Sequence, residues 1–72
     1  ARLARALLRM RDDKGGIETT HEALAVDTGS GRAAISRQLG KFARDGLIAQ
    51  TRGRIDIVDI ARLENMASEV GD

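Results

Sequence analysis

Apolar residues recur at helical spacing in three stretches of the chain. They fall at positions 3, 7 and 10, at positions 35, 39 and 42, and at positions 60, 63 and 66 or 67. Such spacing gathers side chains on one face of an amphipathic helix. The pattern therefore predicts an N-terminal, a middle and a C-terminal helix, each with one face for burial.

A shorter helix is expected between the first two. Either Thr19 or Thr20 can cap its N-terminus, because a hydroxyl there accepts a hydrogen bond from an unpaired backbone N–H. Thr19 with Glu22 three residues later would form a capping box. Residues 27–29, Asp-Thr-Gly, have the composition of a turn, so this helix should be brief.

Glycines and short apolar runs mark further boundaries. Residues 14–16, Lys-Gly-Gly, are expected to end the first helix, and residues 17–18 can add a short edge strand. Residues 47–49 and 55–58 are predicted to be two short strands. Gly53 between them suits a tight hairpin turn that needs a positive φ.

End signals also flank the middle and last helices. Gly46, after Asp45, is the expected C-terminal glycine of the middle helix, and Asp59 the N-cap of the last one. Residues 70–72 are expected to fray. Gly40 lies inside the middle helix. Close packing against a neighbour would justify it there; otherwise it is a local weakness of about 1 kcal/mol relative to alanine.

This order of elements predicts a fold that is mainly α with a small β-hairpin, the winged helix-turn-helix. It consists of a three-helix core plus wing, with flanking N- and C-terminal helices. We expect residues 1–14 to form the N-terminal helix and residues 15–59 the helix-turn-helix and wing. Residues 60–72 would form the C-terminal helix and tail of the same single domain.

The turn between the second and third predicted helices carries the clearest motif. Two helices that cross closely need a small residue at the crossing and a sharp turn after it, often through glycine. Ala25 and Gly29 occupy these positions, and Leu24 and Ile35 would close the angle between the helices.

Two positions that are usually apolar in this motif are polar here. They are occupied by Thr28 and Gln38. We expect Val26 and Leu39 to supply the missing burial.

Composition excludes several classes of site. The 72 residues include no cysteine and one histidine, so disulfides and thiolate metal sites are excluded and no metal site is predicted. His21 has no second histidine, cysteine or paired carboxylate at ligand spacing, and Asp12-Asp13 is explained by a helix end. No serine has a visible base partner in the sequence, where His21 is the sole candidate base. No catalytic residue is assigned, and the chain is not expected to be an enzyme.

Composition also bears on location. No apolar run approaches the roughly 20 residues that span a membrane. The chain begins with Ala1 rather than methionine, which suggests a piece of a longer protein, and a cytoplasmic location is the default expectation.

Charge is segregated along the chain although the net charge is only +1. Residues 1–11 carry four arginines and no acid, whereas residues 12–27 carry five acids and one lysine. Residues 28–54 carry six basic residues against Asp45 alone. The most basic block thus coincides with the third predicted helix and the hairpin. Ordinary solvated surface charge is the alternative explanation.

From about residue 20 to residue 66 the chain resembles a known family, the C-terminal winged-helix domain of Crp/Fnr bacterial transcription regulators. The resemblance is carried by residues 35–42 (Ile-Ser-Arg-Gln-Leu-Gly-Lys-Phe), 45–48 (Asp-Gly-Leu-Ile) and 53–59 (Gly-Arg-Ile-Asp-Ile-Val-Asp). Ser36-Arg37 with Gly40 and Phe42 is most similar to the Fnr branch. The resemblance implies sequence-specific binding of double-stranded DNA, with a recognition helix of about residues 31–44 in the major groove and a wing of residues 49–57 on the backbone.

By this resemblance, the base-reading residues of the family map onto the start of the third helix. They are Arg32, Ala33, Ser36 and Arg37. Arg37 can offer a bidentate fork to guanine O6 and N7, and Ser36 can contact a base edge. By the resemblance, most family members carry a glutamate at position 33, and this chain has alanine there; Ala33 or Ala34 can contact a thymine methyl instead. A surface ion pair is the alternative role for Arg37.

Candidate phosphate contacts surround these positions. They are Thr20, His21, Ser30, Lys41, Arg52 and Arg54, of which Arg54 is the stronger wing candidate. Thr20 can present its hydroxyl and nearby N–H groups to phosphate, or act only as a cap. His21 is expected to be exposed and near phosphate.

The resemblance also implies partners outside this chain. Full-length relatives of this kind bind an inverted repeat as homodimers, with RNA polymerase as a possible further partner. No cofactor is expected within these residues; an effector, a cyclic nucleotide or another small ligand, would bind a missing N-terminal domain. A winged-helix module for protein–protein interaction, without DNA binding, is the alternative.

Overall fold

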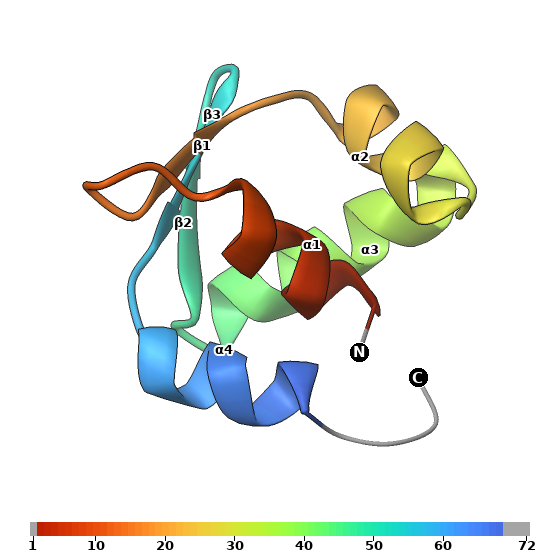
Figure 1. The fold of residues 1–72 in the computed structure, drawn as a ribbon. Helices are drawn as coiled ribbons and strands as arrows, with labels where there is room; N and C mark the ends of the chain where they lie inside the picture. Colours follow the sequence, from red (N-terminus) through yellow and green to blue (C-terminus); the bar gives the residue numbers. More distant parts are fainter. Residues whose placement is uncertain (1, 69–72) are drawn as a thin grey trace.

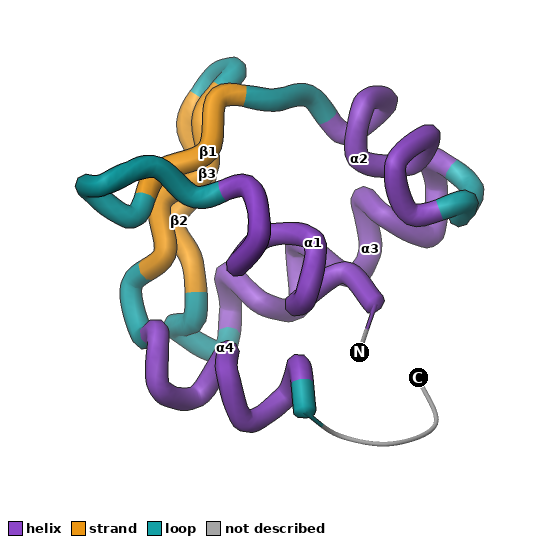
Figure 2. The backbone as a smooth tube through the Cα atoms, viewed as in Figure 1, coloured by secondary structure: helices purple, strands orange, loops and turns teal. Residues whose placement is uncertain are grey.

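The computed structural model describes residues 2–68 and contains four helices and three strands in that range. In chain order these are α1 (Arg2–Met10), β1 (Gly16–Glu18), α2 (His21–Thr28), α3 (Arg32–Arg44), β2 (Ile48–Thr51), β3 (Arg54–Ile57) and α4 (Ile60–Ala67). Figures 1 and 2 show the sheet at one side of the helices and α2 at the other, with α3 running from α2 back toward the sheet. The predicted winged helix-turn-helix fold is confirmed.

The three strands form one antiparallel sheet in the order β1-β3-β2. Ile55 in the central strand pairs with Ile17 on one side and Gln50 on the other. The expected hairpin is thus confirmed and its edge strand is present. Gly53 in the hairpin turn has φ +71°, as predicted.

One hydrophobic core joins the helices and the sheet. The apolar stripe of α3, Ile35, Leu39 and Phe42, lies inside it at 4% exposure or less. The other large buried members are Leu3, Leu7, Ile17, Leu24, Leu47, Ile48, Ile55 and Leu63. A domain of this size buries only about 60% of its unfolded surface, so its stability margin is small. The buried stripe of α3 is therefore central to stability.

The helix termini follow the capping signals in part. The hydroxyl of Thr20 accepts from Ala23 N at 3.1 Å, and Asp59 Oδ1 accepts from Arg62 N at 3.1 Å. Thr20 is therefore the N-cap of α2, which puts Ala23 at the third helical position. The predicted capping box of Thr19 with Glu22 is wrong for this reason.

The first helix ends earlier than predicted. It stops at Met10, and the Asp12 side chain organises the turn that follows, accepting from the backbone N–H groups of Lys14 at 2.8 Å and Gly16 at 2.9 Å. Those two hydrogen bonds lower the pKa of Asp12 below its usual value, and the bond from Gly16 has the larger effect. The glycine pair thus forms a turn into β1, with Gly15 at φ +78°, and not a helix cap.

Val26 covers neither polar position of the motif, of which Gln38 is exposed and Thr28 is buried. Thr28 is buried, and its hydroxyl donates to the backbone oxygen of Leu24 at 2.8 Å. Leu39 is fully buried as expected, but Val26 is 80% exposed. The hydrogen bond within α2 satisfies the buried hydroxyl, so no apolar substitute is needed there.

Some helix-face positions are more exposed than their periodicity indicates. Met10 and Ile60 sit at the ends of their helices and are 36% and 43% exposed. The predicted fraying at residues 70–72 lies outside the described residues. Among residues 2–68, no helix is both long and apolar enough to cross a membrane.

Gly40 is predicted to be a weak point that alanine improves. An added Cβ there would meet nothing within 4 Å, so the close packing that would justify glycine is absent. Gly40→Ala should raise the free energy of unfolding by about 0.5–1 kcal/mol. Gly29→Ala is the matched control, because open space surrounds it too but its φ is +70°. It should lower stability by about 1–2 kcal/mol in denaturant titrations; equal effects of both changes would contradict this.

Asp12 should contribute pH-dependent stability. Its folded-state pKa is lowered, so its contribution is present above the ordinary value of 3.8 and is lost as the pH falls through the lowered value. Asp12→Ala should therefore reduce the melting temperature near about pH 7, with the deficit shrinking toward about pH 2. Asp13→Ala, which removes the neighbouring exposed carboxylate, is the charge-matched control. A deficit in Asp12→Ala that does not change with pH would contradict the prediction.

Candidate nucleic-acid interface

The helix-turn-helix geometry rests on small contacts between α2 and α3. Ala25 is buried, and its backbone oxygen accepts from Ser30 N at 3.0 Å. Gly29 takes the left-handed conformation at the end of α2, and Leu24 and Ile35 are both buried. The predicted motif is confirmed, and α3 is held at a fixed orientation on α2.

The outward face of α3 is cationic. Arg32, Ala33, Arg37 and Lys41 are exposed, and Ser36 is half-buried. No acid occurs anywhere in α3. Within the part of the chain that the structure describes, none of its arginines or its lysine forms an ion pair. These side chains are available to an anionic partner.

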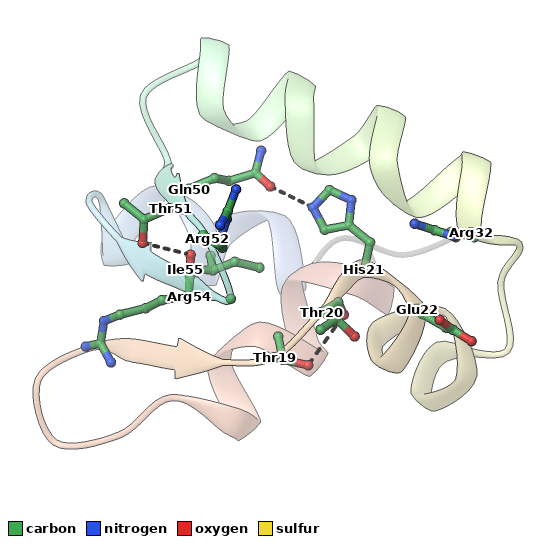
Figure 3. A pocket seen from close by; sticks show the side chains of 11 residues that line it. Thr19, Thr20, His21, Glu22, Arg32, Gln50, Thr51, Arg52, Arg54 and Ile55 are labelled. Carbon is green, nitrogen blue, oxygen red and sulfur yellow. Dashed lines mark hydrogen bonds between the residues drawn. The ribbon is translucent and has the colours of Figure 1, made fainter.

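A groove of about 400 Å³ lies where α2, α3 and the hairpin converge. Figure 3 shows its lining side chains. The starts of the two helices contribute Thr20, His21 and Arg32, and the hairpin contributes Gln50 and Arg52. With Arg54 from β3, the structure thereby brings one predicted base reader and four predicted phosphate contacts to the lining of this groove.

His21 is half-buried, so the expectation that it is exposed is wrong. Its Nδ1 lies 2.9 Å from Ser36 Oγ on α3, and its Nε2 lies 2.9 Å from Gln50 Oε1 on β2 (Figure 3). One imidazole therefore connects α2, α3 and the wing. Sequence reasoning missed Gln50, because only the register of β2 against β3 brings it to this place.

Arg54 lies apart from the groove centre. Its Nε donates to Asp56 at 3.0 Å, and its other nitrogens lie 3.7 Å from Asp12 and 3.8 Å from Glu18. In Figure 3 its guanidinium points toward the turn before β1 and away from Arg32. Its positive charge is thus offset by three carboxylates. Arg52, exposed in the hairpin turn, forms no ion pair with residues 2–68.

Two predicted phosphate contacts lie on a different groove. Ser30 and Lys41 line a hollow with Gln38 and Phe42, beside the N-terminal end of α1. Thr20 does act as a cap, and its exposed position also leaves it at the edge of the His21 groove. Among residues 2–68, no cluster of three histidine, cysteine or acidic residues is placed to hold a metal.

The fold and this cationic helix face define a winged helix-turn-helix, a class of DNA-binding domain. Residues 1–66 match the Crp-like helix-turn-helix domain family, and the chain belongs to it.

Individual relatives are regulators from bacteria. The transcriptional regulator LdrP of Thermus thermophilus is 40% identical over 75 residues, which cover 93% of this chain and 38% of LdrP. The transcriptional regulator SdrP of the same organism is 31% identical over 78 residues, which cover 97% of this chain and 39% of SdrP. A structure from Eubacterium rectale assigned to the Crp/Fnr family superposes with a TM-score of 0.90 at 36% identity, covering 94% of this chain and 32% of that one. The chain thus spans less than two fifths of these relatives.

Proposed function

We propose that this domain binds double-stranded DNA sequence-specifically, with α3 in the major groove and the β2–β3 hairpin on the adjacent backbone. The observation that carries the proposal is the face of α3, which is acid-free and cationic outward while its apolar face is buried. An α-helix fits the major groove, and its N-terminal residues reach base edges.

Base reading is assigned to the first two turns of α3. Arg37 offers a bidentate fork to guanine, and Arg32 extends from the helix start. Ala33 presents a methyl group suited to apolar contact with thymine. Ser36 lies between Ala33 and Arg37 in the sequence, and its hydroxyl is hydrogen-bonded to His21.

Phosphate contacts are assigned around this helix. Arg52 is the first candidate on the wing, because it is exposed and within the described residues forms no ion pair. Arg54 contributes less, since bound carboxylates already offset its charge. Thr20 lies at the N-terminus of α2, where backbone N–H groups favour anions. Ser30 and Lys41 would meet the backbone on the other side of α3.

The complete regulator is proposed to act as a homodimer on an inverted repeat, with half-sites about 34 Å apart. The relatives extend well beyond the region matched here, which leaves room for dimerisation and effector-binding parts. A cyclic nucleotide or another small effector would bind there. RNA polymerase is a further partner, and a chromosomal target places the protein in the cytoplasm.

Arg37→Ala tests base reading. It should weaken binding to a selected site by about 1–3 kcal/mol and relax preference at one base pair. Exposed Arg11, outside α3 and the hairpin, is the charge-matched control, and Arg11→Ala should leave the preference intact. Binding is measured by fluorescence anisotropy on site variants. An equal loss of affinity for selected and random DNA would contradict base reading by Arg37.

Arg52→Ala tests the wing. It should weaken binding to all DNA sequences alike, and it should reduce the steepness of log affinity against log salt concentration by about 1. Arg54→Ala should change that slope less. A domain whose binding partner is a protein need not show steep salt dependence, so a flat salt titration of the parent chain would favour the protein-interaction alternative.

A further inference from the structure

His21 lies at the junction of three elements and touches a proposed base-reading residue. Its two ring nitrogens each have a partner at 2.9 Å, Ser36 Oγ and Gln50 Oε1. The three side chains come from α2, α3 and β2 (Figure 3). Imidazole protonation is therefore coupled to the hydroxyl orientation of Ser36.

The positions of the protons follow from the chemistry of the partners. An amide oxygen only accepts, so His21 Nε2 must carry a hydrogen to bond with Gln50. In the neutral ring Nδ1 is then an acceptor, and the single hydroxyl hydrogen of Ser36 is donated to it. The Ser36 oxygen keeps only lone pairs for any further contact.

We infer that His21 is a specificity-determining positioning residue, which makes Ser36 a hydrogen-bond acceptor toward DNA. This inference rests on the proposed function. An acceptor selects a base that presents an amino group in the major groove, which means N4 of cytosine or N6 of adenine. Guanine and thymine present oxygen at the corresponding edge, and two acceptors facing each other are unfavourable.

Protonation of the imidazole reverses this arrangement. A proton taken from solvent by Nδ1 is donated to Ser36 Oγ, and the hydroxyl hydrogen is freed to point toward the duplex. Ser36 then donates, and bases with oxygen at the edge are favoured. The charged groups around the same groove are Glu22 from α2, Arg32 from α3, Arg52 from the hairpin turn and Arg54 from β3.

The tautomer is testable without DNA. Long-range ¹H–¹⁵N spectra of this 72-residue chain near about pH 8 should show a protonated Nε2 and an unprotonated Nδ1. The opposite tautomer would overturn the inference and leave the proposed function untouched.

Base preference is tested with duplexes carrying each of the four base pairs at every position of a selected site. Near about pH 8, His21→Ala should reduce the preference for amino over oxygen-bearing bases by about three- to tenfold at one position. Gln50→Leu, which removes the oxygen that fixes the tautomer, should act in the same direction. On a Ser36→Ala background, replacing His21 should change that preference no further.

Controls separate the two hypotheses. Glu22→Ala, an exposed neighbour of His21 on the same groove, should leave the pattern unchanged, and thermal melts confirm that each variant is folded. An unchanged preference in His21→Ala, with the Arg37 position still read, overturns the inference alone. Loss of sequence preference at every position in the parent chain overturns the proposed function.

Discussion

Burial of the apolar stripe on α3 is the packing interaction on which the rest of this structure depends. Ile35, Leu39 and Phe42 enter one core together with residues of every other helix and of all three strands. The chain has no cysteine and, in its described part, no metal cluster, so core packing supplies the stability. The same packing sets the helix rotation, because burying one face leaves the arginine-bearing face outside.

Local signals along the sequence predicted most of the fold for identifiable reasons. The i, i+4, i+7 spacing located α1 and α3, and Gly29 and Gly53 marked positions where a positive φ is required. Errors occurred where a distant or competing group decides the local structure. The turn after α1 is organised by Asp12, whose carboxylate accepts hydrogen bonds from two backbone N–H groups of the turn. The glycines alone did not indicate these bonds. Val26 is exposed because the buried face of α2 is formed by Leu24, Ala25 and Thr28. The hydroxyl bond that allows Thr28 to be buried is not visible in apolar periodicity.

The candidate site was less predictable than the fold, because its geometry depends on contacts across long sequence separations. Periodicity alone places Arg37 off the apolar stripe of α3, whereas Arg32 was assigned through the family resemblance. The environment of His21 could not, since its partners Ser36 and Gln50 lie 15 and 29 residues away. The ion pairs of Arg54 likewise join residues from the turn before β1, from β1 and from β3. A count of basic residues in the sequence therefore overstates the positive charge that the wing presents.

The sheet contains one further dependence between distant positions. Gly16 lies beside β3, and the Arg54 guanidinium occupies the space that a Cβ at position 16 would need. A side chain at position 16 would displace this guanidinium, which is the far end of a flexible side chain and can move; the φ of Gly16 is not among the positive values. The two positions are therefore coupled through the sheet: a side chain at position 16 would move the guanidinium from its present place, where its Nε donates to Asp56.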